Sequence, residues 1–146
     1  MPVSSGRENT DRVMKIEIEI KTDAYDEPCR TTAIYENDDS FVKLKWSQQH
    51  EGEKKPSVYK MEYDRASEKA TIRRSGEVGT VLEFVAGEVT CGAVTTAYGT
   101  IPVDIRTEYI NLPSLVSPLF EICYEMTSAG SDLIKNIFSI KLLLQK

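Results

Sequence analysis

Apolar and polar residues alternate most regularly between Arg73 and Tyr109, and this alternation predicts four consecutive β-strands. Successive side chains of a strand point to opposite faces of the sheet, so alternation separates a core face from a face in water. We therefore expect the odd-numbered residues from Ile101 to Tyr109 to line a core and the charged residues between them to face solvent. A glycine stands near each expected reversal of the chain, at Gly76 or Gly79, at Gly87 and at Gly99.

The same alternation predicts strands on both sides of this stretch. The first expected strand runs from about Arg12 to Lys21, with its isoleucines on one face. The last segment, from Asp132 to Gln145, fits a strand and also a helical stripe, and the run of strands before it favours a strand. The other expected strands cover residues 30–36, 41–46, 58–63, 70–74 and 119–126, with turn-forming residues between them.

Roughly ten short strands in sequence order, joined by short turns, predict an all-β fold with mostly antiparallel neighbours. Closing such a sheet into an up-and-down barrel removes exposed strand edges, and a sandwich is the alternative product. We expect one barrel domain over residues 12–146 and a polar, disordered tail over residues 1–11.

Composition and charge limit the kinds of partner and the cellular compartment that the sequence predicts. The 146 residues, 40% hydrophobic and 28% charged, fit one soluble domain, and the net charge of −5 argues against sequence-independent binding of nucleic acid. The start of the chain lacks the apolar centre of a secretory signal, and the longest uncharged stretch is too short to span a membrane. Three widely spaced cysteines match neither a disulfide framework nor a zinc site, so we expect reduced thiols and a cytoplasmic location.

Several residues of the central stretch are typical of one bacterial family. They are Arg74-Ser75-Gly76, Phe84, Thr96-Ala97-Tyr98-Gly99 and Pro102. With these residues the sequence resembles the YwiB-like proteins, a domain of unknown function with a calycin-like β-barrel, from about Val13 to Leu144. The family usually has a proline where this chain has Ala97. The resemblance implies a lipocalin-like antiparallel barrel of about eight to ten strands. It implies no established ligand, reaction or partner.

The sequence contains no arrangement that predicts catalysis, a cofactor or a metal centre. Its only histidine, His50, falls in a polar loop, whereas a Ser–His–acid triad needs a histidine held against a buried acid. One histidine and three dispersed cysteines form no closely spaced set of metal ligands. The glycines at 76 and 79 lie between strands, without the helix N-terminus that phosphate-binding loops use. We therefore expect a non-enzymatic protein.

Arg74 is the most informative candidate site residue. It shares parity with Ala70 and Ile72, so its guanidinium is expected to point into the barrel, where an unpaired charge is very costly. One interpretation is that it closes a barrel end by bonding to backbone carbonyls or to a carboxylate such as Glu36 or Glu62. The other is that it binds an anion. A β-bulge at the following residues would instead turn it outward.

Tyr59 and Tyr98 complete the candidate ligand-binding set with Arg74. Tyr59 lies on an alternating strand, where an aromatic ring is either part of the core or in contact with a ligand. Tyr98 lies in a turn beside Gly99, where its ring is either a gate at the barrel mouth or a staple that packs the turn onto the core. The other aromatic residues expected in the core are Trp46, Tyr63, Phe84, Tyr109 and Phe120.

Two functions remain open at this stage. The first is a binding module whose interior or mouth holds a small, partly apolar or anionic ligand. The second is a filled barrel that acts as a protein-interaction module or a homodimer. The second rests on consecutive leucines at 142–144, at least one of which must face outward and extend a stripe with Leu133 and Ile137. Bulky residues at the inward positions would leave only the mouth for a ligand.

Overall fold

The computed structural model describes residues 13–23, 27–49, 52–114, 116–128 and 133–143, which form ten β-strands and no helix. Each strand pairs antiparallel with its sequence neighbours, and β10 pairs with β1, so the sheet closes into an up-and-down barrel. The expected all-β, antiparallel barrel is confirmed and is consistent with a calycin-like fold. The tail expected at residues 1–11 lies outside the described residues. The strands are β1 (Val13–Thr22), β2 (Cys29–Asn37), β3 (Phe41–Gln48), β4 (Ser57–Asp64), β5 (Lys69–Ser75), β6 (Gly79–Val85), β7 (Val89–Thr96), β8 (Gly99–Asn111), β9 (Leu119–Ser128) and β10 (Ile134–Leu143).

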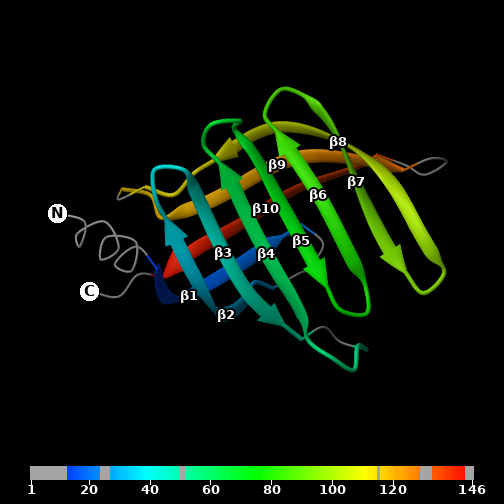
Figure 1. Cartoon of the computed structure of the whole chain (residues 1–146), viewed down its shortest axis with the longest axis horizontal. Coiled ribbons are helices and arrows are strands. Elements are labelled where there is room, and N and C mark those ends of the chain that lie inside the picture. The colour runs from blue at the N-terminus through cyan, green and yellow to red at the C-terminus, as the bar shows by residue number, and fades with distance from the viewer. Residues whose placement is uncertain (1–12, 24–26, 50–51, 115, 129–132, 144–146) are drawn as a thin grey trace, which may run out of the picture.

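The barrel is flattened into two layers that cross each other (Figure 1). Strands β3 to β7 form the front layer, and β9, β10 and β1 cross behind it. The long strand β8 bends from one layer to the other. Because consecutive strands run in opposite directions, β1, β3, β5, β7 and β9 all finish at one end of the barrel. This end is called the mouth below.

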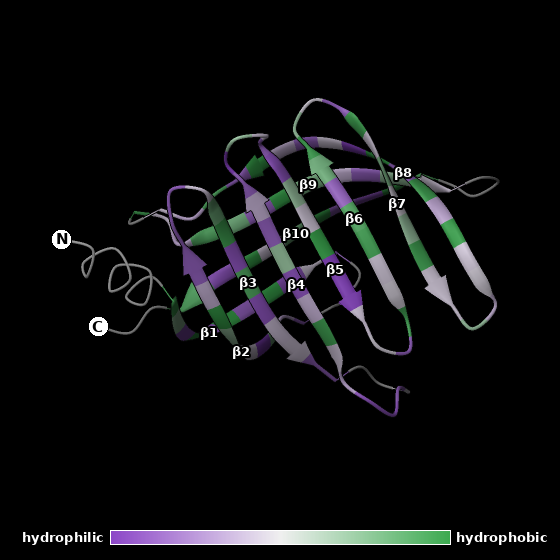
Figure 2. Cartoon of the chain, in the orientation of Figure 1, coloured by the Kyte–Doolittle hydropathy of each residue, from purple (hydrophilic) through white to green (hydrophobic). Residues whose placement is uncertain are grey.

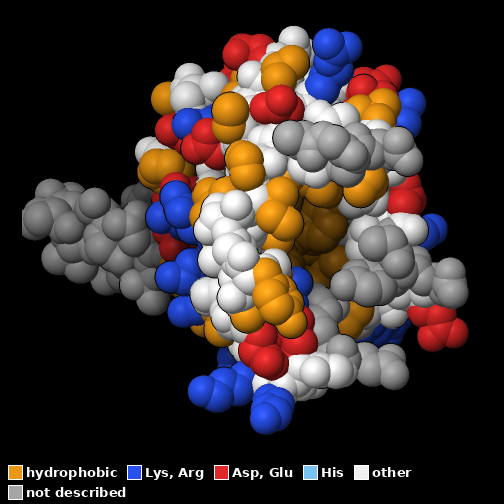
Figure 3. Space-filling view, turned by 90° about the vertical axis from the view of Figure 1, so that its right-hand side faces the viewer, with side chains coloured by type: hydrophobic (Ala, Val, Ile, Leu, Met, Phe, Trp, Pro, Cys, Tyr) orange, Lys and Arg blue, Asp and Glu red, His pale blue; other side chains and the backbone are white. Residues whose placement is uncertain are grey.

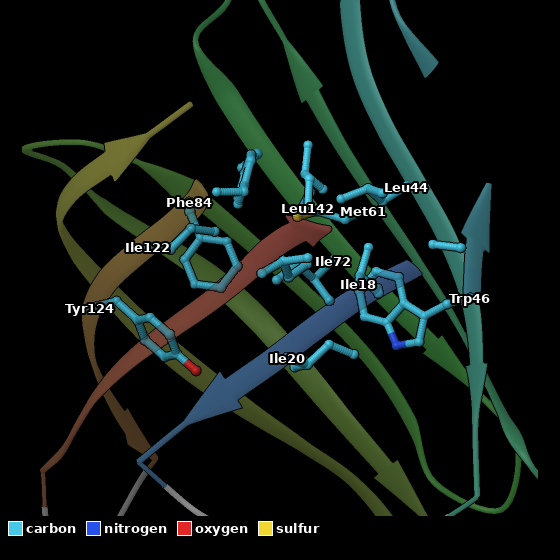
Figure 4. Close-up of a cluster of buried hydrophobic side chains, with 14 of the residues drawn as sticks. Ile18, Ile20, Leu44, Trp46, Met61, Ile72, Phe84, Ile122, Tyr124 and Leu142 are labelled. Atoms are coloured by element: carbon cyan, nitrogen blue, oxygen red, sulfur yellow. The ribbon is translucent and has the colours of Figure 1, made fainter. Parts of the chain in front are cut away.

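Every strand except β7 contributes apolar side chains to the buried core. Figure 2 shows apolar and polar residues alternating along the strands, as the sequence predicts. Trp46 and Phe120 are buried as expected. Phe84 of β6 packs edge-on against Tyr124 of β9, with ring centroids 4.9 Å apart, and so joins the two layers (Figure 4). The buried cluster also includes Ile18, Leu44, Met61, Ile105, Ile122 and Ile140, each at most 1% exposed.

The expected core face of β8 is only partly correct. The register of β8 on β9 shifts between Thr107 and Tyr109, where a bulge inserts an extra residue. Tyr109 is consequently paired with Cys123 on the outer face and is 38% exposed, which contradicts its expected place in the core. Ile101, at the mouth end of the strand, is 48% exposed. The residues that line the core as expected are Val103, Ile105 and Thr107.

Glycine is required at two points of the β7–β8 hairpin for different reasons. Gly99 closes the turn with a φ of 129°, which residues with a side chain rarely adopt. Gly92 has no such φ, but a Cβ atom there would lie 2.8 Å from the Val81 carbonyl oxygen and 2.9 Å from a methyl carbon of Leu82. The missing side chain therefore lets β6 and β7 approach closely and leaves room for Leu82 in the interior.

The last segment of the chain is a strand, so its helical interpretation is wrong. Strand β10 pairs with both β9 and β1 and thereby closes the barrel. Leu142 is buried, and Leu143 is half-buried. Leu144 lies outside the described residues. On the outer face, Lys135, Ser139 and Lys141 alternate with Ile137 and Leu143, so the expected apolar stripe is interrupted by polar side chains.

Candidate functional site

The mouth of the barrel is hollowed, and the visible floor of the hollow is hydrophobic (Figure 3). The cluster of buried apolar side chains lies deeper in the barrel, behind this floor. Tyr59 and Met126 are partly buried and pack against this cluster near the mouth ends of their strands, and Leu82 packs against it from the middle of β6. Ile101 and Ile134 face inward at the rim and are 48% and 55% exposed. The hollow is thus a shallow apolar site that opens to solvent.

Strand register places one row of inward-facing residues along a wall of this hollow. Trp46 of β3 is paired with Tyr59 of β4, which is paired with Arg74 of β5. The row continues through Thr80 of β6 to Val94 of β7. It therefore brings together two of the three residues expected at a ligand site, Arg74 and Tyr59.

Arg74 faces inward as predicted and is bonded to Glu53 of the β3–β4 loop and to Ser57 at the start of β4. Its Nη2 atom lies 2.6 Å from Oε2 of Glu53, and its Nε donates to Oγ of Ser57 at 3.0 Å. The Ser57 hydroxyl donates in turn to Oε1 of Glu53 at 3.2 Å. The Arg74 and Glu53 side chains are only 16% and 17% exposed, so the pair is largely withdrawn from water. The guanidinium charge is neutralised within the protein.

The partner of Arg74 is a carboxylate, as one interpretation expected, but not either carboxylate named for it. Glu36 and Glu62 occupy outward positions on β2 and β4, where both are paired in register with Lys43. The Lys43 ammonium lies 4.0 Å from the Glu62 carboxylate. Glu53 instead comes from the loop before β4, and residue periodicity does not predict where a loop residue points.

Tyr59 is held between an indole and a guanidinium. Its ring stacks on Trp46 with centroids 5.2 Å apart and an interplanar angle of 2°, and the Arg74 guanidinium carbon lies 5.6 Å from its centroid. A cation beside an aromatic face adds electrostatic attraction to the packing. The Trp46 indole Nε1–H is buried and has no hydrogen-bond partner among the described residues, which is rare for a buried donor. Sequence patterns predicted the burial of Trp46 and gave no sign of this unpaired group.

Tyr124 on β9 lies in the other layer and takes part in a polar network that reaches the mouth. Its hydroxyl oxygen accepts from Nδ2 of Asn136 at 2.9 Å. The Asn136 Oδ1 atom accepts from the Thr22 hydroxyl at 3.1 Å and from the backbone N–H of Asp23 at 2.9 Å. Burial raises the pKa of the Tyr124 hydroxyl, so it stays protonated at neutral pH and keeps a hydrogen to donate.

Tyr98 lies apart from Arg74 and Tyr59. It occupies the turn between β7 and β8, where the Thr96 hydroxyl accepts from its backbone N–H at 3.1 Å. Its side chain is fully exposed, so the ring does not staple the turn onto the core. His50, expected in an exposed loop, lies outside the described residues.

The described residues contain no cluster of His, Cys, Asp and Glu that fits a metal ion. The three cysteines are free thiols on β2, β7 and β9. Cys123 is 4% exposed, and its thiol donates to the Glu108 carboxylate at 3.3 Å. Burial is the main cause that raises the pKa of this thiol, and the Glu108 carboxylate adds to the effect. Cys91, in contrast, is exposed on β7.

The two thiols should therefore react at very different rates in the folded protein. Iodoacetamide attacks the thiolate, and both burial and the raised pKa keep the Cys123 thiolate scarce near neutral pH. We expect Cys91 to be alkylated first and Cys123 to react mainly after unfolding in urea. Peptide mass spectrometry along a time course measures both rates. Equal alkylation rates of the two thiols in the native protein would contradict the burial of Cys123 beside the β8 bulge.

Comparison with known proteins gives a family and a fold. The family described as a domain of unknown function, DUF1934, matches residues 10–140. A structure described as the crystal structure of ywiB protein from Bacillus subtilis superposes with a TM-score of 0.63 at 17% sequence identity, covering 90% of this chain and 94% of that chain. That identity shows the fold alone. No curated protein sequence matches the chain.

The match to the DUF1934 family spans most of the chain, from just before β1 into β10. Within the described residues, no helix is long and apolar enough to span a bilayer. The chain therefore belongs to the YwiB-like family of domains of unknown function, DUF1934.

Proposed function

We propose that this protein is a non-enzymatic β-barrel that binds a small, partly apolar ligand at its mouth. The observation that carries the proposal is the hollow with a hydrophobic floor above a filled interior (Figure 3). Binding to such a floor is favoured by about 25 cal/mol for each Å² of apolar surface that the ligand removes from water. The bulky buried side chains of the lumen favour a small ligand over a large one. The free thiols are in keeping with a reducing, cytoplasmic location.

The anionic ligand considered from the sequence has less support than an apolar one. Glu53 and Ser57 already occupy the Nη2 and Nε groups of Arg74. An incoming anion would have to compete with the Glu53 carboxylate, and a displaced carboxylate would remain near the mouth as a repelling charge. We therefore assign Arg74 a structural role at the rim and take the apolar floor as the binding surface.

The proposal is tested by thermal shift with a panel of cell-extract metabolites, because a ligand that binds only the folded state raises the melting temperature. A charge at the rim, Ile101→Glu, should abolish the shift caused by an active compound. Val89→Glu is the matched control, since Val89 is similarly exposed on the neighbouring strand but faces outward. A panel without any active compound, or a shift that survives Ile101→Glu, would count against binding at the mouth.

The second candidate function is dimerisation through the outer face of β10. Register places Ile137 beside Cys123 and Tyr109, and Ile137 and Tyr109 are 39% and 38% exposed, so a short apolar row crosses β10, β9 and β8. Light scattering of the unmutated protein decides this candidate. A dimer that becomes a folded monomer on Leu143→Lys substitution would support it, and a monomeric unmutated protein would remove it.

A further inference from the structure

Two hydrogen-bond donors of the barrel interior have no acceptor within the part of the chain that the structure describes. The Trp46 indole N–H can only donate, and it is buried without a partner. The Tyr124 hydroxyl accepts a hydrogen bond from Asn136 and donates none to the described residues. Buried donors are nearly always paired in native proteins, so two unused donors in one cluster indicate that a partner is missing.

The orientation of the Asn136 amide fixes the role of the Tyr124 hydroxyl. The backbone N–H of Asp23 can only donate, so the amide atom 2.9 Å from it must be the oxygen. The Asn136 nitrogen is thereby directed at Tyr124, whose hydroxyl oxygen must accept. The hydroxyl hydrogen is left free to donate to a group outside this network.

Both donors lie on the same side of the buried cluster. In the view of Figure 4, the Tyr124 hydroxyl oxygen and the Trp46 indole nitrogen lie at the lower margin of the cluster, on either side of Ile20. Strand β1 runs toward this margin and finishes at the mouth. The two donors therefore lie toward the mouth end of the cluster, in different layers of the barrel.

The charge of the interior narrows the ligand further. Among the described strand positions that face inward, Arg74 carries the only charged side chain, and Glu53 neutralises it. A charged group of a ligand would lack a free counter-charge on an apolar floor, and an unpaired charge there is very unfavourable. An uncharged group with an acceptor oxygen meets no such penalty.

We propose that the ligand at the mouth is an uncharged, partly apolar molecule whose carbonyl-type oxygens accept hydrogen bonds from Trp46 Nε1–H and Tyr124 O–H. This inference rests on the proposed function and names the chemical class of its ligand. The Trp46 nitrogen is covered from solvent by the side chains around it. Binding requires the side chains over the nitrogen to move apart as the ligand enters.

Three probes of similar shape and different chemistry test the inference. They share a cyclohexyl ring: cyclohexyl methyl ketone has an acceptor oxygen, ethylcyclohexane has none, and cyclohexanecarboxylate carries a charge. Trp46 is the only tryptophan of the chain, so its indole N–H gives a single side-chain signal in a ¹H–¹⁵N spectrum. We expect the ketone to bind tightest, by about fivefold or more over ethylcyclohexane, and to move the indole proton signal downfield.

A pair of tyrosine variants separates the hydroxyl from the fold. Tyr124→Phe removes the donor and should weaken ketone binding about two- to tenfold while leaving ethylcyclohexane binding unchanged. Tyr35→Phe is the control. The Tyr35 hydroxyl also accepts from an asparagine side chain, at 2.9 Å, and lies near the opposite end of the barrel. Tyr35→Phe should leave the binding of all three probes unchanged.

Each outcome distinguishes this inference from the proposed function. Equal affinity for the ketone and ethylcyclohexane would overturn the carbonyl assignment and leave apolar binding at the mouth intact. Tightest binding of the carboxylate would overturn the uncharged ligand and return the site to anion binding. Equal losses of ketone affinity in the two tyrosine variants would overturn the role of Tyr124. If none of the probes binds, both the inference and the proposed function fail.

Discussion

Replacing Phe84 by alanine should lower the free energy of unfolding by about 3–5 kcal/mol, the range for removal of a buried aromatic ring. Phe84 is fully buried on β6, and its ring meets the Tyr124 ring of β9 in an edge-on contact. This contact joins the two layers of the flattened barrel. The variant loses the free energy gained by transferring the ring out of water. It also loses the contacts around the cavity that the ring leaves, because the surrounding strands relax only partly.

Val81→Ala on the same strand is the matched control. Val81 faces outward and is 37% exposed, so its truncation should change the free energy of unfolding by only about 0.5 kcal/mol. Urea denaturation followed by circular dichroism measures both variants. A loss at Phe84 no larger than that at Val81 would show that the interior collapses around the missing ring, and would contradict a filled lumen.

The regular part of the fold could be predicted from the sequence, because residue alternation is a direct consequence of strand geometry. The isoleucines of β1 illustrate this point: Ile18 and Ile20 are buried, while Glu17, between Ile16 and Ile18, is exposed. The reversals were also predictable, since Gly87 and Gly99 adopt φ angles of 80° and 129° that favour glycine.

The predictions from the sequence are wrong where tertiary structure overrides the local alternation of apolar and polar residues. Alternation continues through Tyr109, but the bulge after Thr107 reverses the faces, and nothing in the alternation marks it. The exposure of Tyr98 likewise depends on how far the β7–β8 hairpin extends beyond the barrel rather than on the residues beside it.

The candidate site was predictable only in part, for the same reason. Parity predicted that Arg74 points inward and that an inward arginine needs a partner. It did not predict Glu53, because a loop residue has no periodicity that fixes its direction. The unused donors of Trp46 and Tyr124 become visible only when every hydrogen bond around them is known. The sequence therefore predicts which strand residues line the mouth better than it predicts their hydrogen-bond partners.

Arg74→Ala should cost about 3 kcal/mol of unfolding free energy, and Arg73→Ala should cost within about 0.5 kcal/mol. The two arginines are neighbours on β5 with opposite directions: Arg73 is exposed, and Arg74 is bonded to Glu53 and Ser57. Removing the guanidinium takes the Arg74 charge away from the poorly hydrated Glu53 carboxylate, and it also removes the contact with the Tyr59 ring. We expect the lower end of the range for buried pairs, because both side chains keep some contact with solvent.

A double-mutant cycle shows whether Glu53 is the cause of this loss. Breaking a buried ion pair from one side is more destabilising than replacing both partners with uncharged groups. Arg74→Met combined with Glu53→Gln should therefore be more stable than Arg74→Met alone, with a positive coupling between the two positions. Urea midpoints of the four proteins give the coupling energy. Equal midpoints for Arg73→Ala and Arg74→Ala would mean that Arg74 faces solvent, and additive effects in the cycle would mean that Glu53 does not hold it. In either case the guanidinium would be available to a ligand, and the mouth would have to be reconsidered as an anion site.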